Sequence, residues 1–332
     1  MTATTSQRAH AFAVVTIVMT LIGWSSVPLF LKHFSHAIDP WTSNGWRYGM
    51  SALLWSPVLV WGLYRRSLPT GVWRAAILPS ALNIVSQVLF CWTFYKIDPG
   101  LATFGLRSNI VFATIGAAVL FAPERVLVRT PGFIVGILMV VLGTFGTMVL
   151  GDGLPRGATL LGVVMAVSSG AGFAAYALAV RSCMAGVNAI ISFAVISLYT
   201  ALGMVVLMLA LGDGHGVGAL ALLDEPSRFA GVPLPMGQFG LLLLSAIIGI
   251  ALGHVFYYYS ISRLGVAASA GVVQLQPFLV SVASWFLFRE TLSIPQWASG
   301  SIAVLGAIAI LVVQSRSRRA PVRTPTPAED EP

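Results

Sequence analysis

The sequence predicts an all-α integral membrane protein with ten transmembrane helices, arranged as two inverted repeats of five helices. Three observations lead to this fold class. Apolar residues make up 57% of the 332 residues and charged residues only 9%, against about 25% charge in a soluble domain. Ten apolar runs follow one another, each close to the roughly 20 residues with which a helix crosses a bilayer. Motifs of the first half of the chain recur in the second.

The predicted helices are separated by short polar, proline or glycine segments. The first run follows Arg8 and His10 and could be read as a signal peptide, but its length and the runs after it favour a retained helix. The predicted spans are 11–31, 45–64, 73–95, 101–121, 132–150, 158–180, 189–211, 238–261, 265–287 and 296–314. Four prolines within these spans are expected to kink them, namely Pro28, Pro57, Pro79 and Pro277. The longest connection, 212–237, is expected to be an external loop.

Basic residues predict the orientation, because cytoplasmic loops carry an excess of Lys and Arg. With the N-terminus inside, twelve of the 19 Lys and Arg residues fall on the cytoplasmic side. An even number of helices then brings the C-terminus inside as well. The predicted divisions are a cytoplasmic tail (1–10), two five-helix repeats (11–150 and 157–314) and a disordered, basic and proline-rich cytoplasmic tail (315–332). The expected location is the plasma (inner) membrane, crossed many times.

The two halves share a pattern of glycine and glutamate. Gly100 precedes Glu124 by 24 residues and Gly265 precedes Glu290 by 25, with an apolar helix between them each time. Each glutamate is followed by a polar turn and a glycine-containing helix. Because five is an odd number, the second copy must enter the membrane from the opposite side. Inverted repeats of this kind are common in secondary transporters.

This doubled pattern resembles the EamA-type members of the drug/metabolite transporter superfamily over residues 11–314. Four segments carry the resemblance: Trp24 to Lys32 with Pro40 and Arg47 after it, Pro123-Glu124-Arg125, Arg289-Glu290-Thr291, and Gln296-Trp297 with Gly300 and Gly306. The chain departs from the pattern in the fifth predicted helix, whose glycines are spaced differently from Glu124. The resemblance implies ten helices, both termini inside, a central cavity and alternating access, often for the export of amino acids or other metabolites.

Two ionisable residues lie well inside the predicted spans, away from their ends. Arg107, about two turns into the fourth span, could bind a carboxylate or other anionic group of a substrate. Alternatively, it could reach the outer interface or pair with a loop acid such as Asp98. His254, deep in the eighth span, could couple proton movement to transport, or it could be a hydrogen-bonded core histidine.

The other candidates for a substrate cavity are uncharged polar or aromatic residues. Residues two apart on a helix point to nearly opposite sides. Gln274 and Gln276 are therefore not expected to face one cavity together, nor are Arg107 and Asn109. Each amide could instead bond between helices, and the aromatic residues could be interface anchors. The complete set of substrate-binding candidates is Arg107, Asn83, Gln87, Asn109, His254, Gln274, Gln276, Trp24 and Tyr176.

Several function classes find no support in the sequence. There is no GxxxxGK phosphate-binding motif, the acidic residues are isolated, and no Cys/His pattern predicts a metal site or cofactor. The net charge of +8 is spread over short loops and tails, which argues against a nucleic-acid partner. We therefore expect a non-enzymatic, ATP-independent transporter whose partners are a small-molecule substrate and the lipid bilayer. A homodimer stays open, as do two other functions, a membrane-embedded enzyme and a non-transporting receptor or scaffold.

Overall fold

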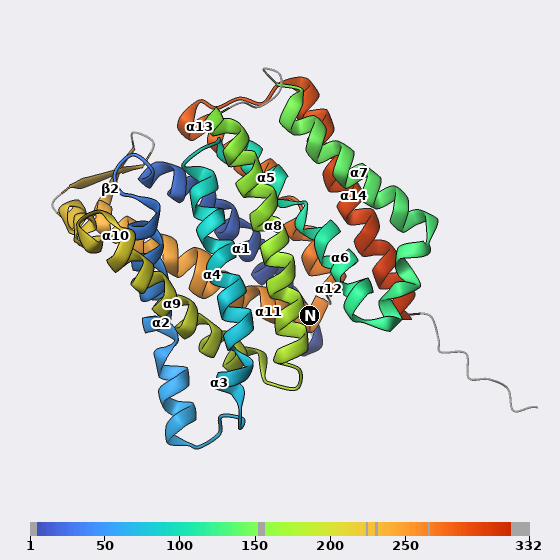
Figure 1. The fold of residues 1–332 in the computed structure, drawn as a ribbon, viewed down its shortest axis with the longest axis horizontal. Helices are drawn as coiled ribbons and strands as arrows, with labels where there is room; N and C mark the ends of the chain where they lie inside the picture. The colour runs from blue at the N-terminus through green and yellow to red at the C-terminus, as the bar shows by residue number, and fades with distance from the viewer. Residues whose placement is uncertain (1–4, 152–156, 224, 230–231, 265, 320–332) are drawn as a thin grey trace, which may run out of the picture.

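Long helices account for most of the chain in the computed structural model, which describes residues 5–151, 157–223, 225–229, 232–264 and 266–319 (Figure 1). The first half contains α1 (Thr5–Phe34), α2 (Pro40–Tyr64), α3 (Val72–Ala75), α4 (Ile77–Phe94), α5 (Pro99–Leu106), α6 (Asn109–Leu120) and α7 (Pro131–Val149). Two 3₁₀ turns, η1 (Ala122–Arg125) and η2 (Leu127–Arg129), lie between α6 and α7.

The second half adds a small hairpin and a π-helical segment to its helices. Its α-helices are α8 (Gly157–Cys183), α9 (Ala189–Leu211), α10 (Gln238–Ala246), α11 (Gly253–Leu264), α12 (Val266–Val273), α13 (Gln276–Phe288) and α14 (Ile294–Arg319). The other elements are the 3₁₀ helix η3 (Asp213–Leu223), strands β1 (Pro226–Phe229) and β2 (Val232–Gly237), and the π-helix η4 (Ile247–Leu252). The predicted tails, 1–10 and 315–332, lie partly outside the described residues, and α14 continues to Arg319.

In the described part of the chain, nine helical segments are long and apolar enough to cross a membrane, where the sequence predicted ten. The predicted span that is missing from these nine is 45–64. It corresponds to α2, which has 25 residues. The first half of α2 carries buried polar residues, among them Thr42, Ser43, Asn44 and Arg47. Its second half exposes apolar side chains, including Leu53, Val60 and Leu63. This helix therefore has the length of a membrane span without uniform apolarity.

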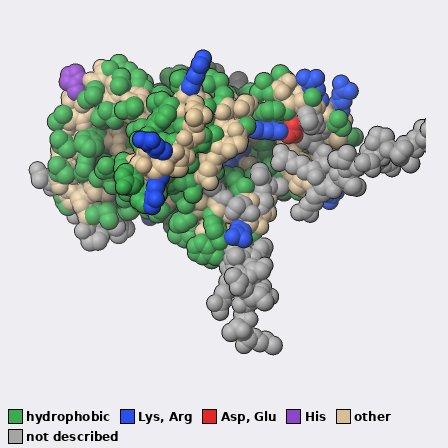
Figure 2. Space-filling model, turned by 90° about the horizontal axis from the view of Figure 1, so that it is seen from below, with side chains coloured by type: hydrophobic (Ala, Val, Ile, Leu, Met, Phe, Trp, Pro, Cys, Tyr) green, Lys and Arg blue, Asp and Glu red, His purple; other side chains and the backbone are tan. Residues whose placement is uncertain are grey.

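Apolar side chains cover much of the outside of the bundle (Figure 2). Large exposed ones occur on nearly every long helix, for example Val60 on α2, Leu142 on α7 and Val206 on α9. Water would make such a surface aggregate, whereas the hydrocarbon core of a bilayer solvates it. The chain is a multi-pass membrane protein.

Four of the predicted spans are divided into shorter helical elements. Ala76 separates α3 from α4, and η4 lies between α10 and α11. The other two divisions are breaks of two residues each. Arg107 and Ser108 separate α5 from α6, and Gln274 and Leu275 separate α12 from α13. Pro277 lies in the first turn of α13, where a helix has no use for the missing N–H. It therefore begins a new helix, and the prediction that it kinks a continuous one was wrong. Irregular backbone at membrane depth is tolerated where it is buried in protein or lines a cavity.

Helices from the two halves pack against each other throughout the bundle (Figure 1). The main pairs are α7 with α14, α2 with α9, α4 with α8, α1 with α11, α6 with α8, and α5 with α13. The first of these pairs approaches closely at Gly143, where an added Cβ would lie 2.5 Å from the backbone nitrogen of Ala303. Small residues allow this approach between helices in a membrane.

The connection 212–237, predicted as a loop, folds onto the ends of α1 and α2. Its strands pair antiparallel, with Phe229 opposite Val232, and the Phe229 ring lies 5.2 Å from that of Phe30 on α1. Trp46 on α2 donates its indole N–H to the carbonyl oxygen of Gly216 at 2.9 Å. The hairpin and η3 therefore form a cap over one end of these two helices.

Candidate functional site

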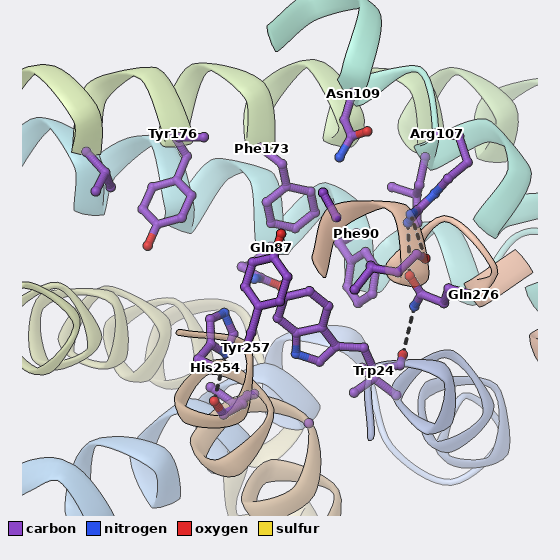
Figure 3. Close-up of a pocket in the computed structure, with 18 of the residues that line it drawn as sticks. Trp24, Gln87, Phe90, Arg107, Asn109, Phe173, Tyr176, His254, Tyr257 and Gln276 are labelled. Atoms are coloured by element: carbon purple, nitrogen blue, oxygen red, sulfur yellow. Dashed lines mark hydrogen bonds between the residues drawn. The ribbon is translucent and has the colours of Figure 1, made fainter. Parts of the chain in front are cut away.

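A cavity of about 460 Å³ lies between the two halves of the chain, in the range typical of small-molecule sites. Its walls come from α1, α2, α4, α8, η4 and α11 and from the two helix breaks (Figure 3). The π-helix η4 contributes Gly249 and Ile250. Such local changes of helix type are frequent at functional sites.

Most of the residues proposed from the sequence meet in this cavity. The ones that line it are Trp24, Gln87, Arg107, Asn109, Tyr176, His254 and Gln276. Gln274 is not among the lining residues, although it contacts Arg107. Asn83 lines a much smaller neighbouring cavity together with Gln87, Tyr176 and His254, and its amide donates to the Thr200 hydroxyl oxygen at 3.0 Å.

Arg107 is buried at the break between α5 and α6, with 7% of its surface exposed. Its Nη2 donates to Oε1 of Gln276 at 2.9 Å, and its Nη1 makes longer contacts of 3.4 and 3.5 Å to the Val273 carbonyl and to Gln274. The alternative that Arg107 pairs with Asp98 was wrong, because Asp98 binds Lys32 instead. All these acceptors are neutral, so among the residues that the structure describes no carboxylate pairs with the guanidinium.

The expectation that Arg107 and Asn109 would not share a cavity was also wrong, because both line it. The same expectation for Gln274 and Gln276 was correct: Gln276 lines the cavity and Gln274 does not, although both accept from Arg107. The rule of opposite sides applies within a continuous helix, whereas Arg107 lies in a break and Asn109 is the first residue after it. The interruption thus turns both of these side chains toward the cavity.

Gln276 continues the hydrogen bonding to the first helix. Its Nε2 donates to the carbonyl oxygen of Trp24 at 2.8 Å, as the dashed lines of Figure 3 show. Pro28 lies one turn further along α1 and has no N–H to offer to that carbonyl oxygen, which leaves it free to accept from a side chain. A chain of hydrogen bonds therefore joins the break in the fourth span, the break in the ninth span and α1.

Aromatic side chains form another part of the wall. The ring of Trp24 lies 4.9 Å from that of Tyr257 and 5.3 Å from that of His254. His254 also stacks on Phe193 at 4.8 Å, and its Nδ1 bonds to the carbonyl oxygen of Ile250 at 2.8 Å. Figure 3 shows Phe90 and Phe173 beside this group. The arrangement offers apolar ring faces to a bound molecule.

Arg47 on α2 is a lining residue that the sequence analysis did not propose. It is only 2% exposed, and its Nε donates to the Ser245 hydroxyl at 2.9 Å. The predicted span began at residue 45, which placed Arg47 at a helix end, whereas α2 begins at Pro40. The signal was Asp39-Pro40: Asp39 caps the helix by accepting from the backbone N–H groups of Trp41 and Thr42, a pattern typical of helix starts.

The charge in the cavity has one sign. Arg47 and Arg107 line it, and no aspartate or glutamate is among the lining residues that the structure describes. Over the same described ranges, no group of three or more His, Cys, Asp or Glu side chains could hold a metal ion. The arrangement therefore suits an anion held by protein groups directly.

Ion pairs lie at two ends of the bundle, and at each end one of them joins the two halves. Lys32 near the end of α1 binds Asp98 at 3.2 Å and Glu290 at 3.1 Å. Arg181 near the end of α8 binds Glu124 at 3.0 Å. Burial, and then the nearby Asp98 carboxylate, raise the pKa of Glu290 above its ordinary value, although Ser284 and Lys32 act against this.

Comparisons with known proteins agree with this architecture. The sequence profile of the EamA-like transporter family matches residues 11–149 and 160–312. One protein of known crystal structure is similar over 93% of this chain and 99% of its own, with 18% sequence identity and a TM-score of 0.54. At that identity the likeness shows the fold alone. No curated protein sequence matches the chain.

Proposed function

We propose that this chain, which belongs to the EamA-like transporter family and is therefore a membrane transporter of the drug/metabolite type, is a secondary transporter that exports a small organic metabolite bearing a carboxylate. Amino acids and related organic acids are the class we infer. The observation that carries the proposal is the cavity between the halves, in which the partners of buried Arg107 within the described ranges are all neutral. A guanidinium in that position is a ready partner for a substrate carboxylate.

We propose ten spans in two inverted repeats, 11–150 and 157–314, with α2 as the tenth membrane helix. The packing supports a two-fold relation between the halves. A two-fold relation would exchange each predicted span with the span five places away in the chain. This exchange leaves the pairs α2–α9, α5–α13 and α7–α14 unchanged. It turns the pair α4–α8 into the pair α1–α11, which is also present. The breaks in the fourth and ninth spans also correspond. Broken helices near the middle of such repeats are typical of transporter binding sites.

We propose alternating access, in which the ion pairs at the two ends open in turn. The pairs occupy equivalent places, each between the last turn of a repeat's first helix and the glutamate that follows the other repeat's fourth helix. Lys32 and Glu290 close the end we assign to the outside, and Arg181 and Glu124 the end we assign to the cytoplasm. The assignment follows the excess of basic residues on the cytoplasmic side. It puts both termini on the cytoplasmic side of the plasma (inner) membrane.

His254 is our candidate for coupling transport to protons. It lines the cavity beside Trp24, and an imidazole changes charge in the physiological pH range more readily than other side chains. The His254→Gln variant is expected to bind substrate but to lose the coupling of flux to a proton gradient. Proton-driven flux at the wild-type level in that variant would remove His254 from the coupling mechanism.

Reconstituted protein tests the proposal directly. Proteoliposomes should show saturable, gradient-driven flux of at least one carboxylate-bearing metabolite from a panel of amino acids and organic acids. The Arg107→Ala variant should lose most of this flux, and Arg74→Ala, which changes an exposed arginine, should keep it. Absence of flux for every solute, with protein that remains folded and monodisperse, would contradict the proposal.

A further inference from the structure

Two buried arginines in the cavity have donor groups that no protein atom uses. Nη2 of Arg47 and Nε of Arg107 are buried without a hydrogen-bond partner among the described residues. The two side chains are 2% and 7% exposed. Buried polar groups are nearly always satisfied in folded proteins, so each such exception calls for an explanation. A bound molecule that supplies acceptors would explain both.

The charges of these arginines also lack a partner. Arg47 bonds to the Ser245 hydroxyl and Arg107 to amide and carbonyl oxygens, all of which are neutral. Neither side chain takes part in an ion pair within the described ranges. Two buried positive charges in one cavity repel each other and any cation that enters. A zwitterion would leave this imbalance unchanged, whereas a molecule with two negative charges would cancel it.

Resting on the proposed function, we infer that the substrate is a small organic dianion without an ammonium group, held by Arg47 and Arg107 together. Arg47 is the second anion-binding residue, and within the carboxylate class of the proposed function the site prefers dianionic organic acids over amino acids. The aromatic wall of Trp24, Phe90, Phe173 and Tyr257 packs against the apolar body of the molecule. The class is therefore that of dicarboxylates or comparable dianions with an apolar or aromatic body.

Three compounds with one carbon skeleton test this inference. Phenylalanine is a zwitterion, 3-phenylpropionate lacks the ammonium group, and benzylmalonate has a second carboxylate in its place. Equilibrium binding to purified protein in detergent, by calorimetry or thermal shift, should rank benzylmalonate first and phenylalanine last. We expect benzylmalonate to bind at least about tenfold more tightly than phenylalanine, the effect of about 1.4 kcal/mol.

Variants assign the preference to the two arginines. Arg47→Gln and Arg107→Gln should each bring the affinities for benzylmalonate and 3-phenylpropionate to within about threefold of each other. The matched control Arg74→Gln should keep the wild-type ranking. Thermal unfolding of each variant checks that it is folded. For Arg47, the milder Arg47→Lys change, which keeps the charge, should retain part of the preference.

Binding and flux separate this inference from the proposed function. Gradient-driven flux of phenylalanine with no preference for benzylmalonate would overturn the inference and leave the transporter intact. Binding that follows the expected ranking without any flux would support the site and contradict transport. Failure of all three compounds to bind, or a preference unchanged in Arg47→Gln, would overturn the inference.

Discussion

Nη2 of Arg107 and Oε1 of Gln276 lie 2.9 Å apart, which joins the break in the fourth span to the break in the ninth. Gln276 also donates to the Trp24 carbonyl, so its orientation is fixed with its oxygen toward the arginine. The position of the guanidinium in the cavity therefore depends on a residue from the other half of the chain.

Replacing Gln276 with leucine should weaken substrate binding. The change removes a hydrogen bond to a charged group, an effect of about 1.5–3 kcal/mol, which corresponds to roughly ten- to hundredfold in affinity. Gln274→Leu is the matched control, because its contact to Arg107 is longer, at 3.5 Å. The two variants should be compared by equilibrium binding and flux. Equal losses in both would contradict a specific role for Gln276.

Breaking the two ion pairs should expose the cavity to opposite sides of the membrane. Glu290→Gln leaves Lys32 with Asp98 alone and should favour the outward-open state. The side chains of Lys32 and Glu290 are 20% and 15% exposed, so the shift should be about 1–3 kcal/mol. Glu124→Gln should favour the inward-open state by less, because Arg181 is 46% exposed and more screened.

A cysteine at Ala177, a small residue of the cavity wall, reports these shifts. It is introduced after Cys91 and Cys183 are replaced, and it is labelled from one side of oriented vesicles at a time. Faster labelling from the outside in Glu290→Gln and from the inside in Glu124→Gln is the expected pattern. The charge-reversed pair Lys32→Glu with Glu290→Lys should restore slow labelling. Faster labelling from the same side in both single variants would argue against paired gates.

Acidic pH should open the outer end. The pKa of Glu290 is raised from its ordinary 4.5, first by burial, so this carboxyl becomes neutral at a higher pH than an exposed glutamate. As the pH falls through that raised pKa, the ion pair with Lys32 is lost and outside labelling of the Ala177→Cys reporter should increase. The Glu290→Gln variant should label quickly at every pH. A wild-type labelling rate that stays constant down to pH 4.5 would contradict this prediction.

The same raised pKa has a consequence for folding stability with a definite sign. Because the folded state holds this proton more tightly than the unfolded state does, the contribution of Glu290 is largest below the unfolded pKa and is lost as the pH rises through the folded pKa. Glu290→Gln should remove that part of the pH dependence in thermal unfolding.

Gly143→Ala should destabilise the pairing of α7 with α14. The added Cβ would lie 2.5 Å from the Ala303 nitrogen and 2.6 Å from the Ser299 carbonyl oxygen, both backbone atoms. Overpacking of this kind costs about 1–3 kcal/mol, which thermal unfolding in detergent measures. Gly271→Ala is the matched control, since nothing lies within 4 Å of its added Cβ. A melting temperature for Gly143→Ala no lower than that of the control would contradict close packing.

Hydropathy was sufficient to predict where the long helices lie, but not where they break. The spans predicted at 101–121 and 265–287 are apolar on both sides of Arg107 and of Gln274, so a sliding average runs through the interruption. The one local sign was Pro277, which the structure places in a first helical turn. Arg47 was missed for a related reason, because the start of its helix was judged from apolarity and not from the cap at Asp39.

The sequence did not predict which residues far apart in the chain contact each other. Lys32 and Glu290 are near opposite ends of the chain, and nothing in their local surroundings specifies that they meet. The same is true of Arg47 and Ser245. By contrast, His254, Trp24 and Arg107 were proposed from the sequence as cavity candidates, and the structure brings them to one cavity, although their mutual geometry depends on breaks that were not predicted.

The uncompensated charges of the two cavity arginines make the protein sensitive to the membrane voltage. An empty site carries two positive charges from Arg47 and Arg107, and moving one elementary charge through 100 mV changes the free energy by about 2.3 kcal/mol. For the proposed exporter, a potential that is negative inside the cell would draw the empty site toward the cytoplasm, where loading takes place. A bound dianion of the inferred class would make the site electrically neutral, so the loaded transporter would turn outward without working against the field.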